Sequence, residues 1–351
     1  MTGSILIYGA TGYTGKLIAR EARARQASAV LAGRNPNKLK AVARRLDLPW
    51  RAFDLADRAG LDAALEDVAV VLSAAGPFSA TARPMADACL TRGAHYLDIT
   101  GEIDVFEQIA ARDAEAKRAG VTLMPGVGFD VVPSDCLAAR LKRRLPDATH
   151  LTLYISAGPN VSRGTAKTMI EGIADGPRAR RNGRLVTLRQ PSTGSCDFGR
   201  GKRPTIQIGW GDVSTAFHST GIPNIEVHFE AAPALQALAR IPGFVRSLLA
   251  LSPAQRVLKA LVDRQPEGPS DGARLKGRAV LVGTARNDKG ETVRARLKTP
   301  EGYTLTSRTS LDAAMRVAAG DFKPGFQTPS LAFGPDYILG FEGVTREELN
   351  A

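Results

Sequence analysis

The start of the chain carries a glycine-rich segment between a short apolar run and a helical pattern. Residues 4–8 read as a strand, and the segment GATGYTG follows at residues 9–15. In this GxxGxxG pattern, Gly9 permits a tight turn, Gly12 lets a backbone approach a pyrophosphate, and Gly15 lets the next helix sit close to the strand. The helix start beyond supplies N–H groups and the positive end of a dipole. This arrangement predicts a dinucleotide-binding loop.

The rest of the first part, residues 1–133, alternates short β-branched or apolar runs with helical patterns. Predicted strands cover 4–8, 29–32, 50–53, 68–73, 94–97 and 121–124, and predicted helices cover 16–25, 37–46, 81–92 and 103–119. Strands that alternate with helices of this length imply parallel βαβ units with right-handed crossovers. We therefore expect an α/β domain of the Rossmann type, a doubly wound parallel sheet.

The end of the second strand indicates which dinucleotide binds. An NAD-binding domain carries Asp or Glu about 20 residues beyond the glycines, but this chain has Arg34 there. A guanidinium suits a 2′-phosphate, and Lys38 adds a second charge. The expected cofactor is therefore NADP(H). Asp54, at the end of the third strand, either reaches the adenine amine or caps the next helix.

Three further loops follow strands at the edge where ligands of such sheets bind. Small residues after the fourth strand, Ala75, Gly76 and Pro77, leave room for the second half of the cofactor. The carboxyl groups of Glu102, Asp130 and Asp135 are the candidate proton donors, because carboxylates that converge at a strand end can have raised pKa values. Asp135 or Ser134 alternatively caps the helix that begins beside them.

Several motifs together resemble a known family. GATGYTG, the AGR turn at 32–34, AGPF at 75–78, HYLDITGE at 95–102 and GVGFDVVPSD at 126–135 are similar to the saccharopine dehydrogenase-like oxidoreductases, particularly the bacterial branch that includes trans-acting enoyl reductases. The resemblance implies an NADP-binding Rossmann domain, a second domain that forms the substrate pocket, and a carboxyl-terminal segment that returns to the first. The form GFDVVPSD departs from that of true saccharopine reductases, which argues against saccharopine itself as the substrate.

The motifs also assign residues to two groups. Residues expected at the cofactor are Gly9, Thr11, Gly12, Tyr13, Thr14, Gly15, Arg34, Lys38, Asp54, Ala75, Gly76 and Pro77. Residues expected at the substrate are Asp98, Thr100, Phe129, Ser134 and Thr165. Thr165 alternatively only opens a helix.

The second part differs in pattern and charge. Residues 134–320 carry strand-like segments that predict an α+β domain with a mixed or antiparallel sheet, and residues 321–351 are expected to return to the Rossmann domain. The chain has a net charge of +12, almost all of it beyond residue 130. Residues 178–203 are rich in Arg, Gly, Ser and Pro, which predicts a mobile basic loop.

The basic second part bears on partners. No helix-turn-helix, zinc or aromatic-stacking signature accompanies the charge, so we expect no nucleic acid. An anionic small molecule or acyl substrate fits better. Residues 233–262 alternate aliphatic residues with basic ones, which is typical either of helices that contact a membrane or of surface helices packed on a core. A homodimer is left open.

The composition excludes other classes. The sequence holds no run of 18 apolar residues, no signal peptide is expected, and the three cysteines lack metal spacing, so we expect a cytoplasmic protein without a metal. The expected function is an NADPH-dependent oxidoreductase that reduces a C=C (enoyl) bond of a lipid-like or carrier-bound acyl substrate. The alternatives are a saccharopine-type reductase of a C=N bond in an amino acid, and a non-catalytic NADP-binding sensor or partner protein.

Overall fold

The computed structural model describes residues 3–158, 161–171, 176–231 and 251–350. The chain divides into two compact units. The first consists of Met1–Val132 and Tyr303–Tyr337, and the second of Pro133–Gly302 and Ile338–Ala351.

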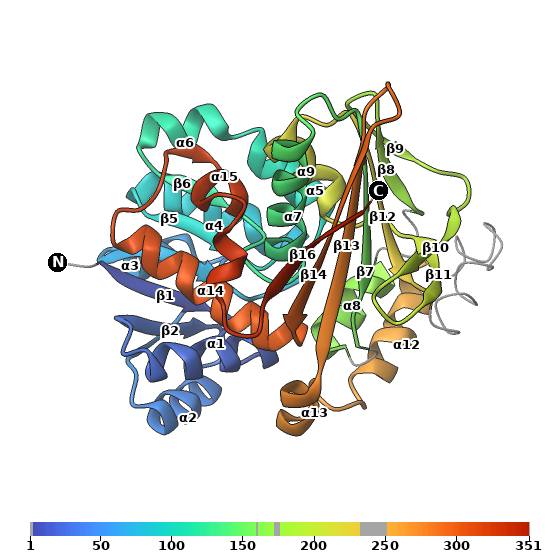
Figure 1. Ribbon diagram of the computed structural model, residues 1–351. Helices are drawn as coiled ribbons and strands as arrows, with labels where there is room; N and C mark the ends of the chain where they lie inside the picture. The colour runs from blue at the N-terminus through green and yellow to red at the C-terminus, as the bar shows by residue number, and fades with distance from the viewer. Residues whose placement is uncertain (1–2, 159–160, 172–175, 232–250, 351) are drawn as a thin grey trace. The chain divides into compact units, whose positions relative to one another are not determined.

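The first unit is built on a parallel sheet, which confirms the predicted Rossmann-type fold (Figure 1). Seven strands of the described chain lie in the order β15-β6-β5-β4-β1-β2-β3. The strands are β1 (Ser4–Tyr8), β2 (Ala29–Gly33), β3 (Trp50–Ala52), β4 (Val68–Ser73), β5 (His95–Asp98), β6 (Thr122–Met124) and β15 (Gly325–Phe326). The helices are α1 (Tyr13–Ala24), α2 (Pro36–Leu46), α3 (Arg58–Ala64), α4 (Phe78–Arg92), α5 (Ile103–Ala110), α6 (Asp113–Ala119), α14 (Gly302–Ala318) and α15 (Pro329–Phe333).

Alternate residues of each strand face the two sides of this sheet. Leu6 of β1 packs in a core with α3, α4, α5 and α6, whereas Ile5 and Ile7 pack in a core with α1, α2 and α14. The helices between β4 and β6 all lie on the first side. The second side of β4–β6, which includes Leu72 and Leu97, is therefore covered by α14, a helix from late in the chain.

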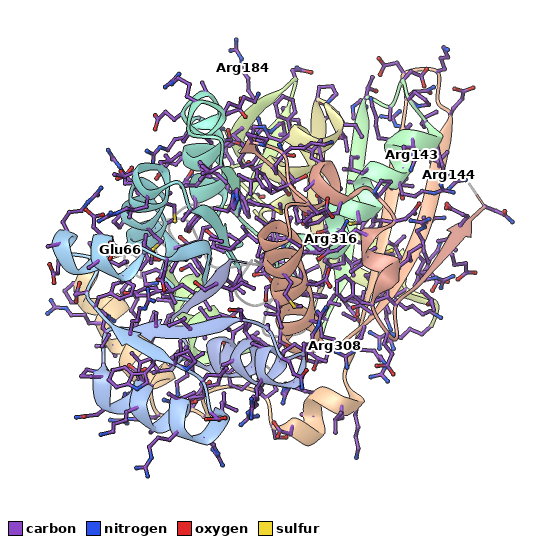
Figure 2. The ribbon with its side chains drawn as sticks, turned by 90° about the vertical axis from the view of Figure 1, so that its left-hand side faces the viewer. Glu66, Arg143, Arg144, Arg184, Arg308 and Arg316 are labelled. Atoms are coloured by element: carbon purple, nitrogen blue, oxygen red, sulfur yellow. The ribbon has the colours of Figure 1, made fainter. Side chains whose placement is uncertain are left out.

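The position of α14 corrects the expected domain limits. We expected residues 134–320 to form the second domain and residues 321–351 to return to the Rossmann domain. The chain returns to the first unit already at Tyr303, and residues 338–351 belong to the second unit. The physical reason is that the apolar side of α14, with Leu311 and Val317, completes the core over the parallel sheet of the first unit, which is called sheet A below. Figure 2 shows Arg308 and Arg316 projecting from the same helix. Arg316 lies over the ring of Phe333, with its guanidinium carbon 4.1 Å from the ring centroid.

The second unit contains a mixed sheet, as predicted. In the described chain its main path is β10-β11-β12-β7-β13-β14-β16, with β7 and β12 parallel and β8 paired to β12 and β9. The strands are β7 (His150–Ser156), β8 (Arg178–Arg181), β9 (Arg184–Thr187), β10 (Thr193–Asp197), β11 (Lys202–Gln207), β12 (Asn224–Glu230), β13 (Arg278–Arg286), β14 (Thr292–Pro300) and β16 (Thr345–Leu349). The helices are α7 (Val132–Arg144), α8 (Arg163–Glu171), α9 (Asp212–Thr220), α12 (Ser252–Val262) and α13 (Asp271–Lys276), and the short 3-10 helix η1 (Tyr337–Gly340) precedes β16.

The prediction of a mobile basic loop at 178–203 is wrong. These residues form β8, β9, β10 and the start of β11. The β8–β9 hairpin turns at Asn182 and Gly183, which both have positive φ, 47° and 76°. An Asn-Gly pair favours this two-residue turn because both residues tolerate the left-handed region, so the local signal was present in the sequence.

Residues 233–262, for which the sequence left open membrane contact or surface helices packed on a core, fall largely on residues 232–250, which lie outside the described residues. The remainder is α12, where Val257 and Leu261 are exposed. Among the helices of the described chain, none is both long and apolar enough to span a bilayer.

Candidate functional site

The glycine-rich segment forms the turn between β1 and α1. Gly9 has a φ of +85°, and a Cβ there would lie 2.8 Å from the amide nitrogen of Ala75. A Cβ on Gly15 would lie 2.2 Å from the carbonyl oxygen of Gly9. These two glycines are therefore required by close backbone packing. Gly12 is different, because it is exposed and a Cβ there would meet only the Gly9 carbonyl oxygen, at 3.4 Å.

The amino-terminal end of α1 fits a pyrophosphate. Gly12 is its N-cap residue, no side chain caps this end, and the first turn holds no acidic residue. The half-buried side chains of Thr11, Tyr13 and Thr14 surround the exposed Gly12. A helix start of this kind offers backbone N–H groups and a positive dipole end to an anion. Since the fold itself does not require glycine at position 12, an approaching ligand is the better reason for it.

Arg34 stands at the carboxyl end of β2, where a 2′-phosphate would be recognised. Its side chain is exposed, as is that of Lys38. The neighbouring Asn35 caps α2 by accepting a hydrogen bond from the Lys38 backbone N–H at 3.0 Å. Arg34 is therefore held at the start of a helix, and its guanidinium faces solvent in the described chain.

The Tyr8 hydroxyl lies within electrostatic reach of both Arg34 and Asp54. Burial raises the pKa of the Tyr8 hydroxyl, Arg34 opposes this shift, and Asp54 adds to it. The Tyr8 ring stacks on Phe53, with centroids 5.2 Å apart. Asp54 accepts a hydrogen bond from the Ala56 N–H at 2.9 Å, while Asp57 caps α3, so the alternative that Asp54 caps this helix is wrong. Sequence reasoning missed Tyr8, although a phenol directly before the glycine loop was visible.

The loop after β4 is held by Glu102. Ala75, Gly76 and Pro77 lead from β4 into α4 through a cis Gly76–Pro77 peptide bond. The two carboxylate oxygens of Glu102 accept hydrogen bonds from the backbone N–H groups of Phe78 and Ser79, each at 2.8 Å. Glu102 thus caps α4 from another loop. The structure shows that Glu102 positions this loop, and its expected role as a proton donor stays a prediction.

Asp98, which we expected at the substrate, links the two neighbouring loops. It is fully buried and accepts hydrogen bonds from the Tyr96 hydroxyl (2.6 Å) and from the backbone N–H groups of Thr100 and Gly126 (2.9 Å each). Burial raises the pKa of Asp98 to about 6, and these hydrogen bonds limit the shift. Thr100, likewise buried, accepts a hydrogen bond from the Glu102 N–H. One carboxylate therefore joins the loops that follow β5 and β6.

Asp130 remains the candidate proton donor in the first unit. It follows β6 beside the half-buried Phe129, and burial raises its pKa to about 7. A Cβ on Gly101 would lie 3.0 Å from its Oδ2 atom, so the carboxyl group lies against the loop after β5. The structure therefore brings Asp130 next to the Gly101–Glu102 loop, as the sequence predicted.

The expected site residues of the second unit lie at helix starts. Ser134 and Asp135 are fully buried in the first turn of α7. Thr165 lies in the first turn of α8, where its N–H donates to the Ser162 hydroxyl at 3.2 Å. Both residues are buried at the position where the sequence placed them, and their expected site roles stay predictions.

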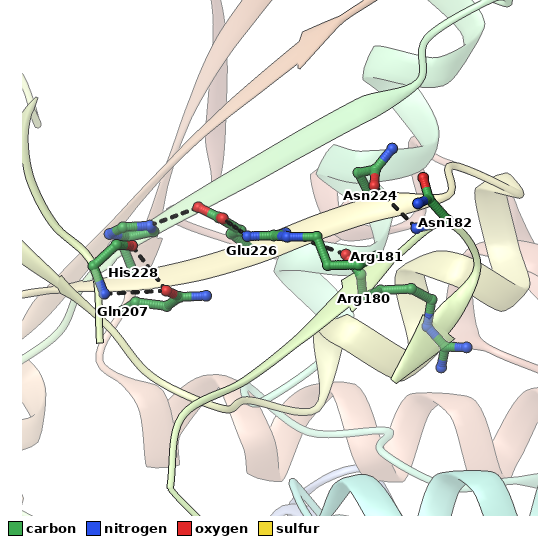
Figure 3. A network of polar contacts seen from close by, with 8 residues as sticks. Arg180, Arg181, Asn182, Gln207, Asn224, Glu226 and His228 are labelled. Atoms are coloured by element: carbon green, nitrogen blue, oxygen red, sulfur yellow. Dashed lines mark hydrogen bonds and ion pairs between the residues drawn. The ribbon is translucent and has the colours of Figure 1, made fainter. Parts of the chain in front are cut away.

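A polar network in the second unit was not predicted (Figure 3). His228 Nε2 lies 3.2 Å from Glu226 Oε2, and Arg181 forms an ion pair with the same carboxylate. The hydrogen bond from His228 and then the charge of Arg181 lower the pKa of Glu226 to about 2. This network joins β8 to β12. Arg181, one of the basic residues of segment 178–203, is paired with a carboxylate of the same unit. Among the described residues, no group of His, Cys, Asp and Glu is arranged to hold a metal ion.

Comparisons with known proteins agree with this geometry. Residues 5–124 match the family model of the saccharopine dehydrogenase NADP binding domain. The chain is 32% identical over 220 residues to the trans-acting enoyl reductase of Mycobacterium tuberculosis (strain H37Rv), covering 58% of this chain and 51% of that protein. It is 28% identical over 211 residues to a human saccharopine dehydrogenase-like oxidoreductase, covering 53% and 49%. The chain spans about a third to a half of the length of the curated relatives it matches.

Solved structures extend the likeness to the whole chain. The apo saccharopine dehydrogenase (L-Glu forming) of Saccharomyces cerevisiae superposes with a TM-score of 0.65 at 12% identity, covering 99% of this chain and 100% of that one. At this identity the match shows the fold alone. The resemblance predicted from the motifs is confirmed as a similarity: residues 5–124 match a saccharopine dehydrogenase NADP binding domain, and the chain shares its fold with a saccharopine dehydrogenase.

Proposed function

We propose that the protein is an NADPH-dependent oxidoreductase that reduces a C=C (enoyl) bond of a lipid-like or carrier-bound acyl substrate. NADPH binding is inferred from the turn at residues 9–15. Gly12 in this turn is exposed, and packing within the protein does not require a glycine there. The similarity to proteins named trans-acting enoyl reductase supports the enoyl part.

Each part of the first unit has a task in this reaction. The amino-terminal end of α1 binds the pyrophosphate, and Arg34 with Lys38 binds the 2′-phosphate. The small residues after β4 leave space for the nicotinamide, and Glu102 holds that loop by capping α4. When bound, NADPH supplies a hydride. The protein's contribution is mainly to fix the position of the acceptor carbon and to exclude water.

Reduction of a C=C bond also requires a proton at the neighbouring carbon. We assign this proton to the carboxyl group of Asp130, because a donor works best when its pKa lies near the working pH. With a pKa of about 7, about half of the Asp130 groups carry a proton at neutral pH. Once the proton has passed to the substrate, burial disfavours the carboxylate that remains, so Asp130 takes up a new proton from solvent.

The cofactor assignment is tested by fluorescence titration of the wild-type chain with NADPH and NADH. Arg34→Ala should weaken NADPH binding by about tenfold to a hundredfold, which corresponds to the loss of a charge-assisted bond of roughly 1.5–3 kcal/mol. NADH binding should stay within about twofold of the wild-type value. Arg44→Ala is the matched control, since Arg44 is an exposed arginine in the last turn of α2, the helix that begins just after Arg34. Equal weakening of both nucleotides by Arg34→Ala would refute the 2′-phosphate role.

The bond that is reduced is tested by NADPH consumption with a short 2-enoyl thioester and, in parallel, with an imine formed from an amino acid and a keto acid. Turnover of the thioester alone supports the proposal. Turnover of the imine alone would favour the amino-acid reductase, and nucleotide binding without any turnover would favour a sensor or partner protein.

A further inference from the structure

Helix α14 places one side of its first two turns against the loops at the carboxyl edge of sheet A. Tyr303, Thr306 and Thr309 are spaced by three residues, so they share a side of this helix. All three contact residues of the first unit that follow β1 or β6. Figure 1 shows this helix beside α1.

Tyr303 contacts the phosphate-binding turn. Its ring meets the ring of Tyr13 edge to face, with centroids 5.1 Å apart and planes at 88°. Tyr13 is the first residue of α1, directly after the exposed Gly12. The edge-to-face arrangement is the one aromatic pairs prefer, and it fixes the direction of both rings.

Thr306 and Thr309 contact the loop that carries Asp130. Thr306 Oγ1 accepts a hydrogen bond from the Phe129 N–H at 2.9 Å, and Thr309 Oγ1 donates to the Val127 carbonyl at 2.9 Å. A Cβ on Gly128 would lie 2.9 Å from Thr306 Cγ2. The Asp130 loop is therefore packed tightly on α14 and hydrogen-bonded to it.

We infer that Tyr303 is a positioning residue for the cofactor, which holds Tyr13 and the pyrophosphate-binding turn in place. Through the same helix, Thr306 holds the loop of the proton donor, so α14 sets the position of one loop relative to the other. The inference rests on the proposed function, because it requires that the turn at residues 9–15 binds NADPH.

The test is nucleotide affinity, measured by fluorescence titration on the full chain. Tyr303→Ala should raise the Kd of NADPH by about three- to tenfold, the value expected for loss of an aromatic pair. Tyr303→Phe keeps the ring and should restore wild-type affinity. Because the pyrophosphate is common to both nucleotides, the Kd of NADH should rise by the same factor, unlike the effect of Arg34→Ala. Tyr303→Leu carries the same test if Tyr303→Ala does not fold.

The control is Tyr337→Ala, which removes a contact from the middle of α14 and leaves the Tyr303–Tyr13 pair in place. The Tyr337 hydroxyl lies 3.2 Å from both the Thr309 carbonyl oxygen and Asp312 Oδ2, and it donates to them. If Tyr337→Ala raises the Kd as much as Tyr303→Ala does, the effect is general loosening and the inference is overturned. An unchanged Kd in Tyr303→Ala, or an equal loss in Tyr303→Phe, also overturns it. A wild-type chain that binds neither nucleotide would instead refute the proposed function, and this inference with it.

Discussion

Substitution of two glycines in one turn separates ligand binding from folding. Both Gly12→Ala and Gly15→Ala add a single methyl group to the segment between β1 and α1. Their surroundings differ: the new Cβ at position 12 meets one oxygen at 3.4 Å, whereas the new Cβ at position 15 lies 2.2 Å from the Gly9 oxygen and 2.9 Å from the Ala10 Cα. The atoms that a Cβ at position 15 would meet belong to the backbone, which cannot move aside as a flexible side chain can.

The expected stabilities follow from these distances. Forcing a methyl group into the packed position 15 should cost about 1–3 kcal/mol or more, which lowers Tm by roughly 2–4 °C per kcal/mol for a unit of this size. At position 12 two small effects oppose each other. Alanine loses less backbone entropy on folding, by about 0.4–1 kcal/mol, but it is a poorer N-cap than glycine. Tm of Gly12→Ala should therefore stay within about 4 °C of the wild-type value.

The expected affinities do not follow the stabilities. A methyl group at position 12 occupies the surface that the pyrophosphate approaches, so Gly12→Ala should raise the Kd of NADPH at least tenfold, or about 1.4 kcal/mol. The assays are thermal unfolding and fluorescence titration on the same samples. Gly272→Ala is the control, because a Cβ there meets no atom within 4 Å. If Gly12→Ala binds NADPH as tightly as the wild type does, the pyrophosphate does not approach Gly12, and the reasoning is refuted.

Two further predictions concern the carboxyl groups. Asp130→Asn should cut turnover at least tenfold while nucleotide affinity is kept. We expect the wild-type rate to fall as the pH rises through about 7, and this fall should be absent in the variant. The folded-state pKa of Asp130 lies above its ordinary value of 3.8, so its stabilising contribution is present below about pH 4 and is lost as the pH rises through about 7. Thermal unfolding from pH 5 to 8 should show a weaker decline in Asp130→Asn, and an unchanged decline would contradict the raised pKa. Glu102→Gln should lower Tm, because a neutral amide replaces the carboxylate that accepts two hydrogen bonds from the start of α4. A cost of about 1–3 kcal/mol is expected, and a Tm equal to that of the wild type would mean that the cap contributes nothing.

The features that could be predicted from the sequence are those whose conformation depends on residues close together in the chain. A strand, a glycine-rich turn and a helix lie within the first 24 residues, so their geometry depends on local backbone preferences. The same holds for Arg34, which follows β2 directly. The Asn182-Gly183 turn is a local signal of the same kind. The β8–β9 hairpin could therefore have been predicted from the sequence.

The roles of the buried carboxylates required the tertiary structure. Glu102 and Phe78 are 24 residues apart in the chain, and Thr306 and Phe129 are 177 apart. A sequence pattern shows which side of its own element a residue occupies, but it does not show which element packs opposite. The sequence therefore placed Glu102 and Asp98 at the correct edge of the sheet, but it did not show the backbone groups that their carboxylates hold.

The sequence by itself determined the parallel sheet, the glycine-rich turn between β1 and α1, and the position of Arg34 directly after β2. Each depends on the order of a few consecutive residues and on the handedness of βαβ crossovers. Only the tertiary structure decided that α14 covers the open side of β4–β6 and meets both loops of the site. The physical reason is that a doubly wound sheet must bury both faces. The residues that cover the second face come from wherever in the chain an apolar helix can reach it.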